Sequence, residues 1–262
     1  MHEQSSVTVV EAGPLATLTL SAPPRNGWRE DTLIRFNDVV MALSRDNSCR
    51  CLIVTGGPSG DDPWFSGGLE ASELDGDPLA GAALSRLFGQ AFGTLRRFPG
   101  VTIAAINGHA LNEGLAWALN CDFRIAARSS SFRYNAGSDG LLPLGGSTQL
   151  LPRLIGEPGA KRMILAEQPL NAAEALAAGL VDEVVSEDQL SERVDALATT
   201  LLRQSPMATR SAKQLIEHAR MRPLETGFAA EREWQAQIIE GGDYLEARRA
   251  HSENRLPQWP NS

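Results

Sequence analysis

The sequence has little that would direct the protein to nucleic acid, a membrane or a metal. Its 262 residues carry a formal net charge of −8, without the clusters of Lys and Arg that hold a phosphate backbone. No apolar run approaches the ~20 residues that span a bilayer. The first ten residues, MHEQSSVTVV, contain no basic segment followed by an apolar one, so we expect no signal peptide. The four histidines are scattered in no metal-binding pattern, which predicts that there is no catalytic metal.

Cysteine is also scarce, with only Cys49, Cys51 and Cys121 in the chain. The C-x-C spacing of the first two fits no common zinc pattern. We interpret all three as small buried residues in the reducing cytosol, and therefore expect a cytoplasmic protein. A chain of this length buries roughly three quarters of its unfolded surface. Its core therefore needs no disulfide or metal.

What the sequence does contain is a set of short apolar runs rich in β-forming residues. Residues 7–10 and 16–20 resemble the two strands of a hairpin. Residues 51–55 and 101–106 are almost continuously apolar, as buried parallel strands are. A short strand is expected at 123–126. Each of the two apolar strands ends at a glycine-containing turn.

Helical periodicity separates these strands and dominates the second half of the chain. Residues 31–44 and 79–98 each place apolar side chains on one stripe, and a helix is predicted from after Gly108 to residue 121. Strands alternating with helices indicate an α/β fold. Further amphipathic helices are predicted at 159–166, 171–179, 187–204, 208–220 and 226–240. We expect a core over residues 1–200 and a helical region over 201–262.

Two glycine-bearing loops follow the apolar strands. The first, WFSGGLE at 64–70, follows strand 51–55, and the second, NGHALNEG at 107–114, follows strand 101–106. Loops at the ends of neighbouring parallel strands can aim two backbone N–H groups at one point, which is how an oxyanion hole is built. Ordinary turns explain the same glycines. No dinucleotide-binding, Walker or nucleophile-elbow motif occurs.

Eight segments together carry a family resemblance. They are PPRNGW at 23–28, LIVTG at 52–56, FSGGLE at 65–70, AINGHAL at 105–111, CD at 121–122, PLGGSTQ at 143–149, IG at 155–156 with Ala160, and AEALAAGLVDEVV at 173–185. In this order and at this spacing the chain resembles the crotonase (enoyl-CoA hydratase/isomerase) superfamily over nearly its whole length.

The resemblance implies a crotonase-like spiral of ββα units with a C-terminal helical region that packs homotrimers, or hexamers made of two trimers. It implies a coenzyme A thioester as substrate, with no other bound cofactor. The thioester oxygen would be held by the backbone N–H groups of Leu69 and Glu113. By the same resemblance, Arg25, Asn26, Gly67 and Gly68, together with Leu69, would contact coenzyme A.

The chain departs from the family where the family's hydratases carry two catalytic glutamates. One glutamate lies three residues after the second oxyanion donor, which is Ala116 in this chain. The other lies seven residues before the proline of the PLGGSTQ segment, which is Ala136. Alanine transfers no proton, so the usual two-glutamate mechanism is not supported. The aspartate nucleophile of related dehalogenases falls near Pro143 and Leu144, which are inert.

Two acidic residues remain near the expected site. Glu113 replaces a family glycine, and its carboxyl is either a general acid or base or a solvated, hydrogen-bonded group. Asp139 precedes a glycine and is either a turn former or a base. Glu70 is expected to cap a helix or bind backbone, and His109 is expected to pack. Tyr134 and Asn135 are further candidate polar groups of the pocket.

Our leading hypothesis is therefore an acyl-CoA enzyme that works through an enolate. The reaction would be hydration, isomerisation, or cleavage of a C–C or thioester bond. Two alternatives stay open from the sequence. One is an acyl-CoA-binding subunit with little catalysis, and the other is a C–C bond hydrolase on the same fold.

Overall fold

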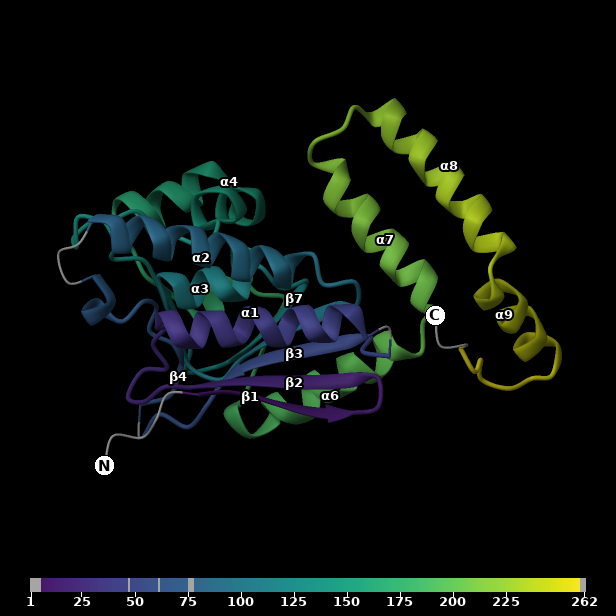
Figure 1. Ribbon diagram of the computed structural model, residues 1–262, viewed down its shortest axis with the longest axis horizontal. Helices are drawn as coiled ribbons and strands as arrows, with labels where there is room; N and C mark the ends of the chain where they lie inside the picture. The colour runs from purple at the N-terminus through teal and green to yellow at the C-terminus, as the bar shows by residue number, and fades with distance from the viewer. Residues whose placement is uncertain (1–5, 47, 61, 75–77, 260–262) are drawn as a thin grey trace.

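The structure, a computed structural model, describes residues 6–46, 48–60, 62–74 and 78–259. Residues 1–5, on which part of the signal-peptide expectation rests, lie outside the described residues. Figure 1 shows a layered α/β body from which the C-terminal helices extend. Over the described ranges, no helix combines the length and the apolar character needed to cross a membrane.

A six-stranded sheet forms the centre of the body, in the order β1-β2-β3-β5-β7-β10. Its strands are β1 (Ser6–Ala12), β2 (Leu15–Ser21), β3 (Cys51–Gly56), β5 (Val101–Ile106), β7 (Phe123–Ala127) and β10 (Glu183–Val185). β1 and β2 form the antiparallel hairpin that the sequence predicts, and the remaining pairs are parallel. The four apolar runs that follow residue 15 all became strands of this sheet, so these predictions are confirmed.

A second, four-stranded sheet has the order β4-β6-β8-β9. It contains β4 (Trp64–Ser66), β6 (His109–Leu111), β8 (Ser131–Arg133) and β9 (Leu170–Asn171). The predicted helix from Gly108 onward is therefore wrong at its start. The segment at 109–111 is a strand, because β6 pairs with β4 on one side and β8 on the other. From β3 to β8 the chain alternates between the two sheets, which is the spiral that the family resemblance implies.

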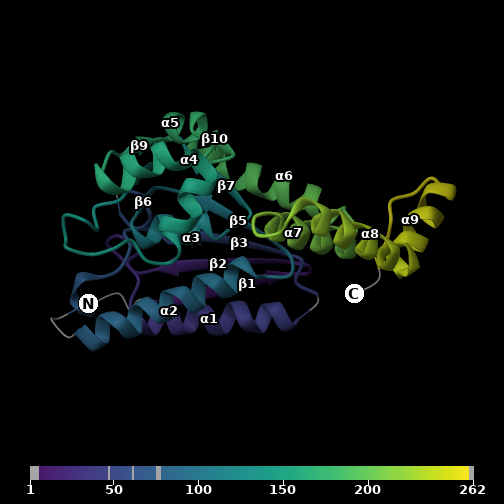
Figure 2. The same cartoon turned by 90° about the horizontal axis from the view of Figure 1, so that it is seen from above.

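Helices cover both faces of the large sheet (Figure 2). α1 (Glu30–Arg45) and α2 (Pro78–Arg96) pack on one face, where their apolar stripes meet the core side chains of β3 and β5. α6 (Leu190–Leu202) covers the other face. The predicted helices at 31–44 and 79–98 are confirmed, since burying an apolar stripe is what stabilises an amphipathic helix. Ile34, expected on the first stripe, is instead 45% exposed.

The shorter elements connect these layers. They are α3 (Glu113–Leu119), α4 (Ser147–Leu165), α5 (Ala172–Ala177) and the 3-10 turns η1 (Ala71–Leu74) and η2 (Glu187–Gln189). α4 begins at Ser147 instead of residue 159, because its two segments continue across a kink at Gly156, where φ is 74°. α5 begins at the predicted capping box of Asn171 and Glu174.

The C-terminal arm consists of α7 (Pro206–Ala219), α8 (Leu224–Glu240) and α9 (Gly242–Ser252). Figures 1 and 2 both show it extending away from the sheets. None of the described residues of α7 or α8 is buried. The sequence predicts α7 and α8 but not α9.

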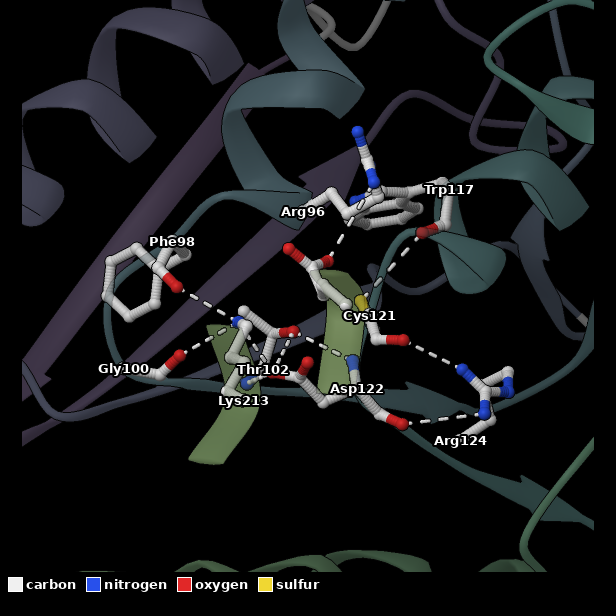
Figure 3. Close-up of polar contacts among 10 residues, drawn as sticks. Arg96, Phe98, Gly100, Thr102, Trp117, Cys121, Asp122, Arg124 and Lys213 are labelled. Carbon is white, nitrogen blue, oxygen red and sulfur yellow. Dashed lines mark hydrogen bonds and ion pairs between the residues drawn. The ribbon is translucent and has the colours of Figure 1, made fainter. Parts of the chain in front are cut away.

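One buried lysine fastens the arm to the body (Figure 3). Lys213 of α7 donates to the carbonyl oxygens of Phe98 and Gly100, at 2.9 Å each, and pairs with the Asp122 carboxylate at 2.7 Å. That carboxylate also accepts from the N–H and the hydroxyl of Thr102, at 2.8 and 3.0 Å. The Lys213 side chain is 10% exposed. The first helix of the arm is therefore tied to the start of β5.

Candidate active site

The loop after β4 is positioned by the chain segment after β2. The Trp28 N–H donates to the Gly68 carbonyl at 2.7 Å, and the Glu70 N–H donates to the Trp28 carbonyl at 2.9 Å. The Gly67 N–H donates to the Arg25 carbonyl at 2.7 Å. These three hydrogen bonds pair the loop with residues 25–28 in the manner of two short strands. The N–H group of Leu69 takes no part in this pairing.

Asn26 holds this arrangement together from inside. Asn26 is fully buried, and its backbone adopts a φ of 50°. Its amide group donates to the carbonyls of Gly57 and Trp64, at 2.8 and 2.7 Å, and its oxygen accepts from the Ala22 N–H at 3.0 Å. Each of its hydrogen-bonding groups therefore serves the backbone. Asn26 therefore ties the segment after β2 to the end of β3 and the start of β4.

The loop after β6 lies directly against the end of β4. At Gly114, a Cβ atom would lie 2.1 Å from the Ser66 carbonyl oxygen, so only glycine permits this approach. The Glu113 N–H opens α3 and donates to no described residue. The Leu69 and Glu113 segments are thus neighbours, as the two-loop hypothesis requires.

The side chain of Glu113 turns back into this junction. Its Oε2 accepts from the Leu69 N–H at 3.0 Å, and its Oε1 accepts from the Leu144 N–H at 3.3 Å. Glu113 is 5% exposed. The predicted oxyanion donor of Leu69 therefore already binds a carboxylate oxygen. Of the two interpretations from the sequence, the hydrogen-bonded carboxylate describes Glu113 in this state.

The two alanines at the expected glutamate positions, Ala116 and Ala136, are both buried. A Cβ added at Gly145 would lie 3.0 Å from the Ala116 Cβ and 2.6 Å from the Phe92 ring. The interior is therefore tightly packed around Ala116, where the resemblance would place the family's first glutamate. Nothing in Ala116 or Ala136 can move a proton.

Tyr134 contributes a buried hydroxyl close to Glu113. The residue is fully buried, and its hydroxyl oxygen forms no hydrogen bond of ordinary geometry with any described residue. Burial raises the pKa of the Tyr134 phenol, while the neighbouring Ser147 hydroxyl opposes this rise and the Glu113 charge adds to it. At neutral pH the phenol therefore keeps its proton and is a donor.

Asp139 lies further out, on the surface. It is exposed, and its Oδ2 accepts from the Asn135 amide at 3.3 Å. Asn135 in turn exchanges two hydrogen bonds with Asn112, at 2.6 and 2.9 Å. This chain of amides links Asp139 to the residue before Glu113. The predicted turn around Asp139 is present, and its function as a base stays a prediction.

The other residues singled out from the sequence lie around the rim. The Arg25 guanidinium stands 5.6 Å from the centre of the Trp64 ring, at the outer side of the loop after β4. His109 does more than pack, because its ring contacts the Asp62 carboxylate at 3.1 Å and the Ser131 hydroxyl at 2.8 Å. Asp62 is 66% exposed. We interpret this trio as a clamp that joins β6 and β8 to the segment before β4.

The paired loops and alternating sheets define an α/β protein of the crotonase fold. Comparison with known proteins gives the family. A sequence profile described as enoyl-CoA hydratase/isomerase matches residues 11–262. The chain therefore belongs to the enoyl-CoA hydratase/isomerase family.

Individual relatives agree with this assignment. The chain is 31% identical to 1,2-epoxyphenylacetyl-CoA isomerase of Escherichia coli, over 95% of this chain and 96% of the relative. It is 30% identical to short-chain-enoyl-CoA hydratase of Clostridium acetobutylicum, over 97% of both. The relatives' names support an enzyme, and favour neither a binding-only subunit nor a C–C bond hydrolase.

Solved structures show the same fold. Pseudomonas aeruginosa DspI matches with a TM-score of 0.92 and 40% identity, over 97% of this chain and 96% of that one. An enoyl-CoA hydratase from Bacillus anthracis matches with a TM-score of 0.92 and 28% identity, over 98% and 99%. The predicted fold class is thus confirmed.

One contact of this site is not visible in the sequence. The side chain of Leu144 is inert, yet its backbone N–H donates to the Glu113 carboxylate. The glycine that follows it in the PLGGSTQ segment, Gly145, has a φ of 66° and could have signalled an unusual backbone there.

Proposed function

We propose that this enzyme binds an acyl-CoA thioester and stabilises its enolate with the backbone N–H groups of Leu69 and Glu113. One observation carries the proposal: the Leu69 N–H holds an anionic oxygen, that of Glu113, at 3.0 Å. A donor that fits a carboxylate oxygen also fits the oxygen of a developing enolate. The Glu113 N–H beside it is unused within the described residues.

The acid or base of the reaction is proposed to be the Glu113 carboxyl. It lies on the second loop of the centre and accepts hydrogen bonds from Leu69 of the first loop and from Leu144. With Ala116 and Ala136 unable to act, the proton on the substrate's α-carbon has this acceptor close at hand. The product class, whether from hydration, isomerisation or cleavage, follows from the acyl group and is not assigned. Asp139 is a reserve candidate for the same chemistry.

Coenzyme A is proposed to lie along the loop after β4. The backbone of Gly67, Gly68 and Leu69 would line its pantetheine arm, with Asn26 holding that loop. The Arg25 guanidinium, at the outer side, has no carboxylate partner among the described residues and would face a phosphate. No further cofactor is needed for enolate chemistry of a thioester.

Turnover measurements test this proposal. The loss of the conjugated thioester absorbance of crotonyl-CoA is followed first, because fast hydration would contradict a centre without the usual glutamates. Glu113→Gln is then compared with the wild type on a panel of acyl-CoA thioesters. We expect binding to change little and turnover to fall by about 10²–10⁴-fold, as for loss of a general acid or base. Unchanged turnover would remove the carboxyl from the mechanism.

A matched control is Glu187→Gln. The Glu187 carboxylate also accepts a backbone N–H, that of Ser129 at 2.9 Å, but outside this centre. It should leave turnover unchanged. If no acyl-CoA binds to any of these proteins, the proposed function itself fails.

The arm is proposed to assemble the protein into a homotrimer, or a hexamer of two trimers, as a separate region over 201–262. It carries large apolar side chains in the open, including Ile216 at 66%, Met221 at 81% and Leu224 at 70% exposure. Apolar surface of this kind usually marks a contact with another chain. Light scattering on the purified protein tests the mass, and a monomer would contradict the proposal.

We place the protein in a reducing compartment such as the cytoplasm. Burial raises the pKa of the Cys49 thiol to about 11 and those of Cys51 and Cys121 to about 12. All three are therefore protonated and unreactive at neutral pH. Thiols of this kind need no oxidising environment.

A further inference from the structure

We propose that the Glu113 carboxylate is an internal competitor for the substrate's binding site, so that an acyl-CoA thioester binds only by displacing it from the Leu69 N–H. This inference rests on the proposed function. It adds that the site is occupied by the protein itself before the substrate arrives. It also assigns Glu113 a second task, which precedes any proton transfer.

The competition follows from the number of hydrogens available. A backbone N–H carries one hydrogen, and that of Leu69 is engaged by Glu113 Oε2 at 3.0 Å. A thioester oxygen brought to the same hydrogen would meet the carboxylate oxygen. The same Oε2 also lies over Gly68, where an added Cβ atom would be 3.0 Å from it. The carboxylate therefore uses the hydrogen of the Leu69 N–H and occupies the space next to Gly68.

The carboxylate is held firmly enough to matter. It accepts two backbone hydrogen bonds, from Leu69 and Leu144, and is almost fully buried. Hydrogen bonds to a charged group are stronger than neutral ones, so displacement carries a measurable cost in affinity. A glycine at this position, as in the family pattern, would carry no such cost.

Affinity measurements on two variants test the proposal. Butyryl-CoA, which is saturated and lacks the conjugated double bond, is titrated by calorimetry into the wild type, Glu113→Gly and Glu113→Gln, with Glu187→Gln as the control. We expect Glu113→Gly to bind about tenfold tighter than the wild type or better. Glu113→Gln keeps an acceptor but loses the charge, and should bind within about threefold of the wild type. The control should match the wild type.

Added acetate identifies the chemistry of the exposed donor. In Glu113→Gly a free carboxylate can take the place of the lost side chain, so 100 mM acetate should weaken butyryl-CoA binding relative to sodium chloride at about the same ionic strength. In the wild type the two salts should act alike. Amide exchange of Leu69 without ligand gives an independent readout, since its protection should fall in Glu113→Gly, which lacks the acceptor, and be largely kept in Glu113→Gln.

The outcomes separate this inference from the proposed function. Tighter binding by Glu113→Gly with acetate competition supports the inference. Equal or weaker binding by a folded Glu113→Gly, while the wild type binds butyryl-CoA, overturns it and leaves the proposed function standing. Unchanged Leu69 protection in a folded Glu113→Gly also overturns it. Failure of every folded protein to bind any acyl-CoA overturns both.

Discussion

Replacing Lys213 by methionine should weaken the whole molecule through one side chain. Methionine keeps much of the apolar length of lysine and removes the charge and all three donors. The Phe98 and Gly100 carbonyls then lose the donor that reaches them at 2.9 Å, and Asp122 loses its cation at 2.7 Å. The perturbation is local, but it lies at the joint between the arm and the body.

The size of the stability loss depends on how deeply the Lys213–Asp122 ion pair is buried. Removing one partner of a buried ion pair costs roughly 3–5 kcal/mol. The Asp122 side chain is 24% exposed and keeps two hydrogen bonds from Thr102, so its carboxylate is not left bare. We therefore expect a loss near the lower end, about 3 kcal/mol in the free energy of unfolding. With a urea m-value of about 3 kcal/mol/M, the midpoint would fall by about 1 M.

Urea denaturation at one fixed protein concentration measures this loss. Lys161→Met is the matched control, because Lys161 pairs with Glu157 on an exposed helix face and should cost at most about 0.5 kcal/mol. The double variant Lys213→Met/Asp122→Asn should be less destabilised than the sum of the single variants. If Lys213→Met behaves like Lys161→Met, the joint contributes nothing and the reasoning is refuted.

Two further predictions concern a glycine and a carboxylate. Gly145→Ala places a methyl group against Phe92 at a φ of 66° and should cost about 1–3 kcal/mol of stability in denaturant titrations. Gly60→Ala should cost less, because Gly60 also has a positive φ but an added Cβ would meet no atom within 4 Å. Equal losses would contradict the crowding argument. The pKa of Glu246 is lowered from 4.5 to about 2, mainly by the Arg255 hydrogen bond. Because the folded value is depressed, this contact is fully present above pH 4.5 and is lost as the pH falls towards 2. Nuclear magnetic resonance titration of that carboxyl checks the value, and a midpoint near 4.5 would refute the contact.

The sequence predicted the parts of the fold whose pattern is local. β3 and β5 are continuous apolar runs, and α1 and α2 each show a full apolar stripe, so each element is recognisable without its neighbours. Three-residue strands such as β6 are too short to show an alternation, and only their pairing across the small sheet makes them strands. The first part of α4 was not predicted because Pro152 and Pro158 lie inside the helix and proline ordinarily marks a helix break.

The site was predictable to the same extent. Motif spacing located the Leu69 and Glu113 loops, and the structure brings them together. Motif spacing does not tell where the Glu113 side chain points, because its hydrogen-bond partners lie 44 and 31 residues away along the chain. A rotamer fixed by such distant backbone is a property of the assembled fold. That Ala116 and Ala136 stand where the family's glutamates would be stays a prediction, although alanine is inert in any environment.

The contact at Gly114 has a consequence for anyone who would redesign this centre. Two stretches of bare main chain touch there, so the separation of the two N–H groups is set by the backbone and is closed to tuning at that position. New chemistry has to enter through side chains, and that of Glu113 already reaches Leu69 and Leu144. Residue 116 leaves little room for a larger side chain, because it already meets the tightly packed turn at Gly145.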